Sequence, residues 1–377
     1  MSEPVTINFG FTPLVDCAIP VVAHEMGFAQ EEGIRLNLVR EASWAAMRDK
    51  LAFGVLDAAH ILAGIPIASS LGLGGAPRVA MIAPMGLGRG GSAITVSNTL
   101  YQRMLEAEPT IMTGPRAQVA RALRTVIEQD RRAGRPPLSF ASVFPVSSHN
   151  YELRYWLAAG GIDHARDVNL GVVVPPRMVE SLRMGWIDGY CVGEPWNLRA
   201  VQQGLGAIVA TRADIWQDAP DKVLGVRKEW AEQNPDLLLA LIRACVRAAR
   251  WADASENRTV LADMLATQHY VAAPVELLRA TLTGKPVLRR GAEASDLPDR
   301  HVFYRQQAAF PWRSHAHWLL TQMRRCGQVG ADIDMRAAAE SVYRPDLYRR
   351  AVAPLGLPVP AGDWKSEDRE ATGEEAV

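Results

Sequence analysis

The opening segment of the chain alternates strand-like apolar runs with a helical pattern. Residues 7–10 and 34–39 are short apolar or alternating runs that predict strands, and residues 17–26 between them have a helical pattern. Asp16 stands directly before this helix, at a position where an aspartate commonly caps the first turn. The order strand, helix, strand favours an α/β fold.

A second helix is expected over residues 44–53, with Ser43 as its N-cap and an apolar strand after it. The segment that joins this helix to its strand, Gly54–Ala58, resembles Gly185–Gly189 far along the chain. Both segments read glycine, two apolar residues, aspartate and a small residue. Two similar lobes would explain this echo, and so would chance over five residues.

Two further predicted strands would connect such lobes. Residues 93–96 predict a strand leaving the first lobe, and residues 190–192 a strand leading back through Glu194, which makes Glu194 a candidate hinge or cleft residue. The end of the chain is acidic and lacks apolar periodicity, which predicts disorder. The expected boundaries are 1–93 with 208–355 for lobe 1, 94–207 for lobe 2 and 356–377 for the tail.

Composition narrows the classes of function. The 377 residues include 41 basic and 41 acidic side chains and are 48% hydrophobic. This composition is typical of a globular chain. The equal numbers of basic and acidic side chains give no net electrostatic attraction to nucleic acid or to a membrane surface, so neither direct nucleic-acid binding nor membrane insertion is expected. An export signal is not evident at the N-terminus, which predicts a cytoplasmic location. The four cysteines lack CxxC or zinc spacing, which predicts free thiols and no metal centre.

Motifs of common enzymes are absent or out of context. Gly86–Gly91 formally matches GxGxxG, but residues 93–96 predict a strand where the dinucleotide fingerprint requires a helix. His315 and His317 have no carboxylate or cysteine at metal-ligand spacing, so they are expected to be structural. The sequence has no nucleophile elbow, HExxH or Walker loop. These absences disfavour a hydrolase, a zinc protease or a phosphate-transfer enzyme without excluding catalysis, and no catalytic residue or cofactor is assigned.

Three donor-bearing residues at element edges suggest a pocket for a small anion. Trp44 starts one predicted helix, His149 lies at the start of another, and Lys222 is one of five lysines among 41 basic residues. An indole N–H, an imidazole, an ammonium and helix N-terminal amides would together stabilise an oxyanion where water is excluded. Taken singly, Trp44 fits a core anchor, His149 a cap and Lys222 a surface residue.

Several segments of the chain resemble the nitrate- and bicarbonate-binding proteins of ABC importers, over about residues 5 to 350. The resemblance implies a type II periplasmic-binding-protein-like α/β fold, in which two lobes close on the anion. The segments that carry it are Glu41–Asp49, Asp57–Leu62, His149 with Arg154–Asp163, Gly193–Asn197, Asp214–Trp216, Pro220–Gly225 and Phe310–His315.

The resemblance also implies ligand residues. Trp44, His149 and Lys222 match the family's anion-contacting tryptophan, histidine and lysine, and Pro175 matches a proline that lines the same cleft. A lysine at position 222 favours nitrate or nitrite, because the bicarbonate-binding branch has an acidic residue there and a lysine can neutralise the anion directly. Ser92 stands where the family often has a glutamine ligand, which leaves fine selectivity open. Lys222→Glu is therefore predicted to abolish nitrate binding and to leave the fold intact.

Without an export signal, the chain is most similar to the cytoplasmic nitrate/nitrite sensors of the NasS type, which hold an RNA-binding antiterminator inactive until the anion binds. The expected function is thus a sensor that closes on nitrate or nitrite and releases an antiterminator of the response-regulator type. One alternative is the substrate-binding component of an ABC importer, for nitrate or, less favoured, bicarbonate. A thiamine-pyrimidine-synthase-like enzyme is a remote alternative, because its cysteine-rich iron motif is absent.

Overall fold

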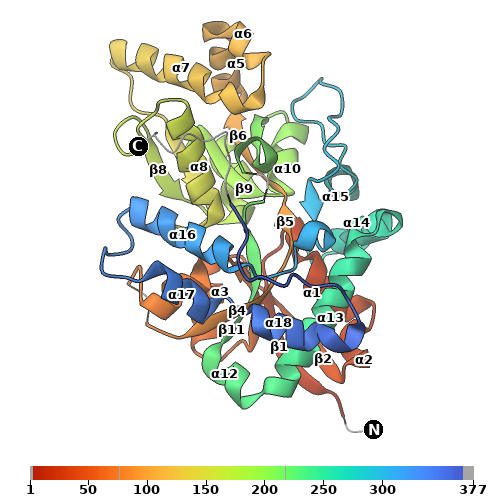
Figure 1. Ribbon diagram of the computed structural model, residues 1–377. Coiled ribbons are helices and arrows are strands. Elements are labelled where there is room, and N and C mark those ends of the chain that lie inside the picture. Colours follow the sequence, from red (N-terminus) through yellow and green to blue (C-terminus); the bar gives the residue numbers. More distant parts are fainter. Residues whose placement is uncertain (1–2, 76, 217, 368–377) are drawn as a thin grey trace. The chain divides into compact units, whose positions relative to one another are not determined.

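A computed structural model describes residues 3–75, 77–216 and 218–367 and divides them into two compact units (Figure 1). Unit 1 contains the chain up to Arg89, then Ala219–Thr283 and His301–Glu367. Unit 2 contains Gly90–Asp218 and Gly284–Arg300. No helix among the described residues is long and apolar enough to cross a lipid bilayer.

These units differ from the predicted lobes in two segments. Residues 208–218 belong to unit 2 because strand β10 (Gly206–Thr211) pairs with β6 (Ser92–Ser97). Residues 284–300 also belong to unit 2, where the carbonyl of Leu288 accepts a hydrogen bond of 2.8 Å from the amide of Ile208. Strand pairing between distant segments sets these boundaries, and local sequence patterns do not report it.

Unit 1 is built on a five-stranded sheet of order β2-β1-β3-β11-β4. Strands β1, β2 and β3 are parallel, β11 is antiparallel to β3, and β4 is antiparallel to β11. The parallel strands confirm the α/β prediction: β1 and β2 lie at the predicted positions, and β3 is the strand expected after the helix that Ser43 caps. The strand bounds are β1 Val5–Phe11, β2 Ile34–Arg40, β3 Ala58–Leu62, β4 Met81–Gly86 and β11 Lys222–Arg227.

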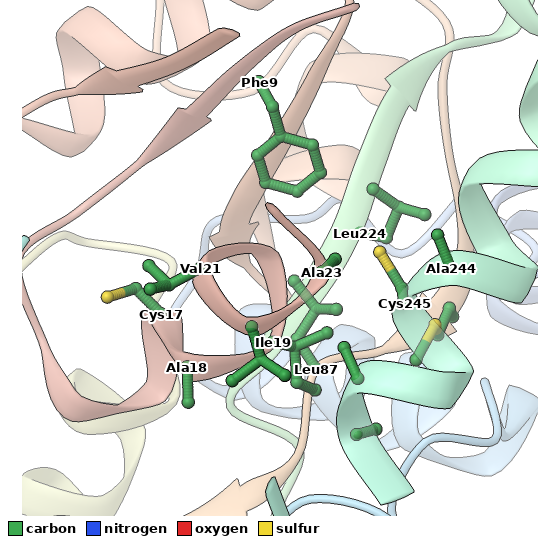
Figure 2. Packing of buried hydrophobic residues seen from close by; sticks show 14 of the residues in the cluster. Phe9, Cys17, Ala18, Ile19, Val21, Ala23, Leu87, Leu224, Ala244 and Cys245 are labelled. Carbon is green, nitrogen blue, oxygen red and sulfur yellow. The ribbon is translucent and has the colours of Figure 1, made fainter. Parts of the chain in front are cut away.

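Helices α1 (Ala18–Glu25) and α13 (Pro235–Asp253) pack together in the core of unit 1. Figure 2 shows Ala23 of α1, Leu224 of β11 and Cys245 of α13 in this cluster. Burial of these apolar side chains ties two distant chain segments to one sheet. The other helices of unit 1 are α2 Phe28–Glu31, α3 Trp44–Ala52, α4 Ile65–Leu71, α12 Lys228–Gln233, α14 Arg258–Ala266, α15 Val275–Leu282, α16 Arg313–Arg325, α17 Met335–Val342 and α18 Pro345–Val352.

Unit 2 repeats the sheet topology of unit 1. Its order is β10-β6-β9-β7-β8, with β7 parallel to β8 and β9, β6 antiparallel to β9, and β10 antiparallel to β6. The remaining strand bounds are β7 Ser139–Ser142, β8 Asn169–Val172 and β9 Gly189–Gly193. Its helices are α5 Asn98–Ala107, α6 Pro109–Met112, α7 Ala120–Arg132, α8 Ser148–Ala159, α9 Met178–Arg183, α10 Trp196–Gln202 and α11 Arg212–Ile215.

The two similar five-residue segments of the sequence occupy the same place in the two sheets. The amide of Asn8 in β1 donates to Asp57 Oδ2 at 2.9 Å, and Asp57 leads into β3. The amide of Ser139 in β7 donates to Asp188 Oδ2 at 2.8 Å, and Asp188 leads into β9. The repeated aspartate therefore joins equivalent strands in each unit, which favours the two-lobe explanation of the echo over chance.

The glycine-rich segment Gly86–Gly91 leads from β4 through β5 (Arg89–Gly90) into β6, without a helix. The rejection of a dinucleotide fingerprint is thereby confirmed for this segment. Gly90 has a φ of +92°, and a Cβ atom there would lie 2.3 Å from the carbonyl oxygen of Arg300. Only glycine fits this backbone position without a shift.

Part of the predicted acidic tail is ordered on unit 1. Arg349 Nη1 donates to Asp363 at 2.6 Å, Arg313 Nη1 lies 2.8 Å from the same carboxylate, and the guanidinium of Arg336 lies 4.8 Å from the centroid of the Trp364 ring. The prediction of disorder does not hold for residues 356–367, because basic side chains of α16, α17 and α18 contact them. Residues 368–377 lie outside the described residues.

Candidate functional site

The predicted ligand residues of unit 1 lie at one edge of its sheet. The parallel strands β1, β2 and β3 all end at this edge, and the antiparallel strand β11 begins there with Lys222, which pairs with Leu62 at the end of β3. Trp44 begins α3, the helix that follows β2. The carboxyl edge of an open α/β sheet is where such folds bind ligands.

Trp44 is placed by the cap of its helix. Ser43 Oγ accepts a hydrogen bond of 3.4 Å from the amide of Ala46, as the sequence predicted. The Trp44 side chain is buried, its ring centroid lies 6.0 Å from that of His60, and Lys222 Nζ lies 5.6 Å from the Trp44 ring. Its indole Nε1 makes no hydrogen bond within the described residues, which leaves a buried donor available to a ligand.

Lys222 is only 1% exposed, so it is not a surface residue. Its Nζ lies 2.8 Å from Asp16 Oδ2 and 2.7 Å from Asp221 Oδ1, and His60 Nε2 lies 3.0 Å from Asp16 Oδ1. Direct neutralisation of a bound anion by Lys222 stays a prediction. The ammonium already contacts two carboxylates, because burial of a lysine requires compensating charge.

Asp16 was predicted as a helix cap and instead belongs to this cluster. It lies in the short 3₁₀ helix η1 (Val15–Cys17), and α1 begins without a side-chain cap. Burial raises the pKa of the Asp16 carboxyl, but Lys222 and His60 together lower it to about 2. Sequence reasoning also missed His60 and Asp221. The adjacency of Asp221 to a rare lysine was the available signal.

The predicted residues of unit 2 lie at the corresponding edge of its own sheet. Ser92 begins β6 and pairs with Gly193 at the end of β9, just as the first residue of β11 pairs with the end of β3 in unit 1. His149 is the second residue of α8, which follows β7, and Pro175 begins a 3₁₀ helix after β8. In the repeat, Ser92 and Lys222 are therefore equivalent positions.

Ser92 takes part in a buried polar network. Its Oγ donates to Glu152 Oε2 at 2.8 Å and accepts from Arg212 Nε at 2.8 Å. Arg212 Nη2 lies 2.6 Å from Glu152 Oε1 and donates to Ser148 Oγ at 3.1 Å. Ser92 therefore orders a buried arginine–glutamate pair, which sequence reasoning did not identify. Its role as a ligand residue stays a prediction.

His149 and Pro175 are both buried in unit 2. His149 lies in the first turn of α8, where Ser147 Oγ caps the helix by accepting from the amide of Asn150 at 3.1 Å. A position in the first turn sets His149 beside the amides that a helix N-terminus leaves unpaired. Anion contact by these two residues stays a prediction.

The assignment of Glu194 as a hinge or cleft residue stays a prediction. Glu194 follows β9, which is paired on both sides within the unit 2 sheet, and it precedes α10. Its carboxylate accepts from the amide of Leu198 at 3.1 Å and forms an ion pair with Arg300. Burial raises the pKa of Glu194, and Arg300 opposes that rise. These buried contacts hold the Glu194 side chain in unit 2.

Known proteins are similar in sequence to this chain over nearly its whole length. Residues 1–266 match the model of the NMT1-like family. The nitrate/nitrite binding protein NrtA of Synechococcus elongatus is 33% identical over 95% of this chain and 80% of that protein. The nitrate import ATP-binding protein NrtC and the bicarbonate transport ATP-binding protein CmpC of a Synechocystis strain are 39% and 35% identical. The chain spans 52% and 51% of their lengths, about half.

Solved structures confirm the predicted type II periplasmic-binding-protein-like fold. The crystal structure of the periplasmic nitrate-binding protein NrtA from Synechocystis PCC 6803 matches with a TM-score of 0.88 and 29% identity, covering 96% of this chain and 93% of that chain. The alkanesulfonate-binding protein SsuA from Xanthomonas axonopodis pv. citri shares the fold, with a TM-score of 0.60 and 14% identity over 91% of this chain and 100% of that chain. The chain therefore belongs to the NMT1-like family, together with these nitrate/nitrite-binding and bicarbonate-transport proteins.

Proposed function

We propose that this protein binds a small monovalent oxyanion, nitrate or nitrite. The observation that carries the proposal is the buried pair of Lys222 and Trp44 at the carboxyl edge of the unit 1 sheet. An ammonium and an unpartnered indole N–H are suitable donors to an oxyanion, and burial removes the competition of water. The 33% identity to a nitrate/nitrite binding protein supports this ligand, and bicarbonate is the alternative, since other relatives are bicarbonate transport proteins.

We propose further that the protein holds an antiterminator of the response-regulator type inactive in the cytoplasm and releases it when the anion binds. The resemblance to the cytoplasmic nitrate/nitrite sensors supports this role. The four cysteines are free thiols, three of them buried, which is compatible with a reducing compartment. In such a sensor the anion and the protein partner oppose each other by the same factor, because coupling between two binding events is reciprocal.

The first test is calorimetric titration with nitrate, nitrite and bicarbonate. Trp44→Phe keeps an aromatic ring and removes the indole donor, so nitrate affinity should fall about tenfold, or about 1.4 kcal/mol. Trp186→Phe is the matched control, because Trp186 is 67% exposed and outside the cluster. Equal affinities in Trp44→Phe and the unmodified protein would remove Trp44 from the site, and a response to bicarbonate alone would favour that ligand.

Lys222→Glu should also abolish nitrate binding, but the structure changes the expectation for the fold. A glutamate there would bring a third carboxylate next to Asp16 and Asp221 in a buried place, which is destabilising. Unfolding of this variant must therefore be measured beside its titration. The sensor role is tested separately with an antiterminator partner: release on addition of nitrate supports it, and binding indifferent to nitrate favours an importer component.

A further inference from the structure

The charged cluster around Lys222 has no net positive charge. One ammonium faces the two carboxylates of Asp16 and Asp221, and the imidazole of His60 lies against Asp16. All four residues are less than 9% exposed. The cluster is therefore negative when the imidazole is neutral and uncharged when the imidazole is protonated.

An anion that binds Lys222 would add a further negative charge to this buried group. Uncompensated charge is costly away from water, so a binding mode that brings a compensating positive charge is favoured. A proton from solvent is the simplest source of that charge. The oxyanion itself is a poor acceptor for it, because nitrate is the anion of a strong acid.

The contacts of His60 indicate where the proton would reside. A carboxylate can only accept a hydrogen bond, so the ring nitrogen facing it, Nε2, carries the hydrogen in the neutral ring. Neither ring nitrogen makes a hydrogen bond of good geometry within the described residues, and Nδ1, which has no carboxylate beside it, is open to an added proton. Asp16 from η1 lies against the ring, Lys222 at the start of β11 contacts Asp16, and Asp221, which precedes β11, contacts Lys222. Helix α3 presents the uncharged Trp44 to the ring.

We infer that anion binding at Lys222 takes up one proton, held by the His60–Asp16 pair, and that these two residues position the Lys222 ammonium. The inference rests on the proposed anion-binding function. It assigns to Asp16 and His60 a role in ligand binding that they exert through Lys222. A helix cap or an ordinary core side chain would have no such role. It also predicts that affinity for nitrate weakens as pH rises.

The inference is tested by calorimetric titration of the full chain with nitrate at pH 8 in HEPES and in Tris, buffers with different heats of ionisation. The dependence of the observed heat on the buffer should correspond to about one proton taken up per nitrate. The dissociation constant should then rise with pH, because a binding step that takes up a proton is weakened when protons are scarcer. Binding with no proton uptake would overturn the inference and leave the proposed function in place, whereas the absence of nitrate binding would overturn the proposed function itself.

Variants identify the group that holds the proton. His60→Gln should bind nitrate more weakly and without proton uptake, while His269→Gln, at an exposed histidine, should retain the uptake. Asp16→Asn removes one negative charge from the cluster and should reduce the uptake, which keeps the inference testable if His60→Gln folds poorly. Unchanged uptake in both cluster variants would place the proton elsewhere and overturn the assignment.

Discussion

At the scale of single residues, the ammonium of Lys222 lies between Asp16 Oδ2 at 2.8 Å and Asp221 Oδ1 at 2.7 Å. The scarcity of lysine singled out this residue in the sequence, and its burial agrees with that signal. Its partners could not be anticipated, because Asp16 is distant along the chain and was explained locally as a cap. Interactions across strands therefore decide how its charge is used.

The Asp16 carboxylate should make unfolding depend on pH under acid conditions. Its pKa is lowered from 3.8 to about 2 in the folded protein, so the stabilisation is fully present above pH 3.8 and is lost as pH falls toward 2. A shift of this size corresponds to about 2 kcal/mol. Chemical unfolding from pH 5 to pH 2 should show a steeper loss of stability in the unmodified chain than in Asp16→Asn.

Glu3→Gln is a suitable comparison for the acid series, because Glu3 is exposed. Its unfolding should follow that of the unmodified protein at each pH. If Asp16→Asn also follows the unmodified protein, the ion pair with Lys222 contributes no net stability.

At the scale of elements, the antiparallel strands β11 and β6 occupy equivalent places in the two sheets. Each is the first strand of its sheet after the chain changes units. Strand β11 enters the sheet of unit 1 late in the sequence, and β6 enters the sheet of unit 2 early. These strands begin with Lys222 and Ser92 at the carboxyl edges of the two sheets. The internal repeat thus places two residues of different chemistry, Lys222 and Ser92, at equivalent edge positions.

The repeated aspartate of the two units should stabilise both sheets by the same interaction. Asp57 accepts from the amide of Asn8, and Asp188 accepts from the amide of Ser139. Asp57→Ala and Asp188→Ala each remove a charged acceptor from a strand amide, so each should lower the free energy of unfolding by about 1–3 kcal/mol. Denaturant unfolding measures the effect.

Asp296→Ala provides the control for these variants, because among the described residues the Asp296 carboxylate has an exposed ion pair with Lys285 at 2.9 Å and no strand amide as donor. Its cost should stay below about 1 kcal/mol. A loss in one unit without a comparable loss in the other would argue against an equivalent role of the two aspartates.

At the scale of the whole molecule, unit 2 depends on a segment that returns to it late in the sequence. Arg300 ends this segment, forms an ion pair with Glu194 and donates from Nη1 to the carbonyl of Ser92 at 2.9 Å. Both charged side chains are at most 3% exposed. The residue predicted as a hinge is therefore fixed by an arginine distant from it in the chain.

Arg300→Met should destabilise the protein by about 3 kcal/mol, because it leaves the Glu194 carboxylate buried without its partner. Adding Glu194→Gln should recover part of this loss, since the uncompensated charge is then removed. Arg279→Met, which breaks an exposed pair with Asp263, should cost less than about 1 kcal/mol. Thermal or denaturant unfolding of the single and double variants tests the pair, and equal effects of Arg300→Met and Arg279→Met would contradict it.

The sequence by itself determined the α/β class, the positions of the first strands and the helix that Ser43 caps, because these follow from local periodicity and capping chemistry. It also contained the repeated aspartate segment. Only the tertiary structure decided that Asp16 contacts Lys222 and that residues 284–300 belong to unit 2. Strand pairing and charge compensation join segments far apart in the chain, and no local pattern records which distant partner a side chain will meet.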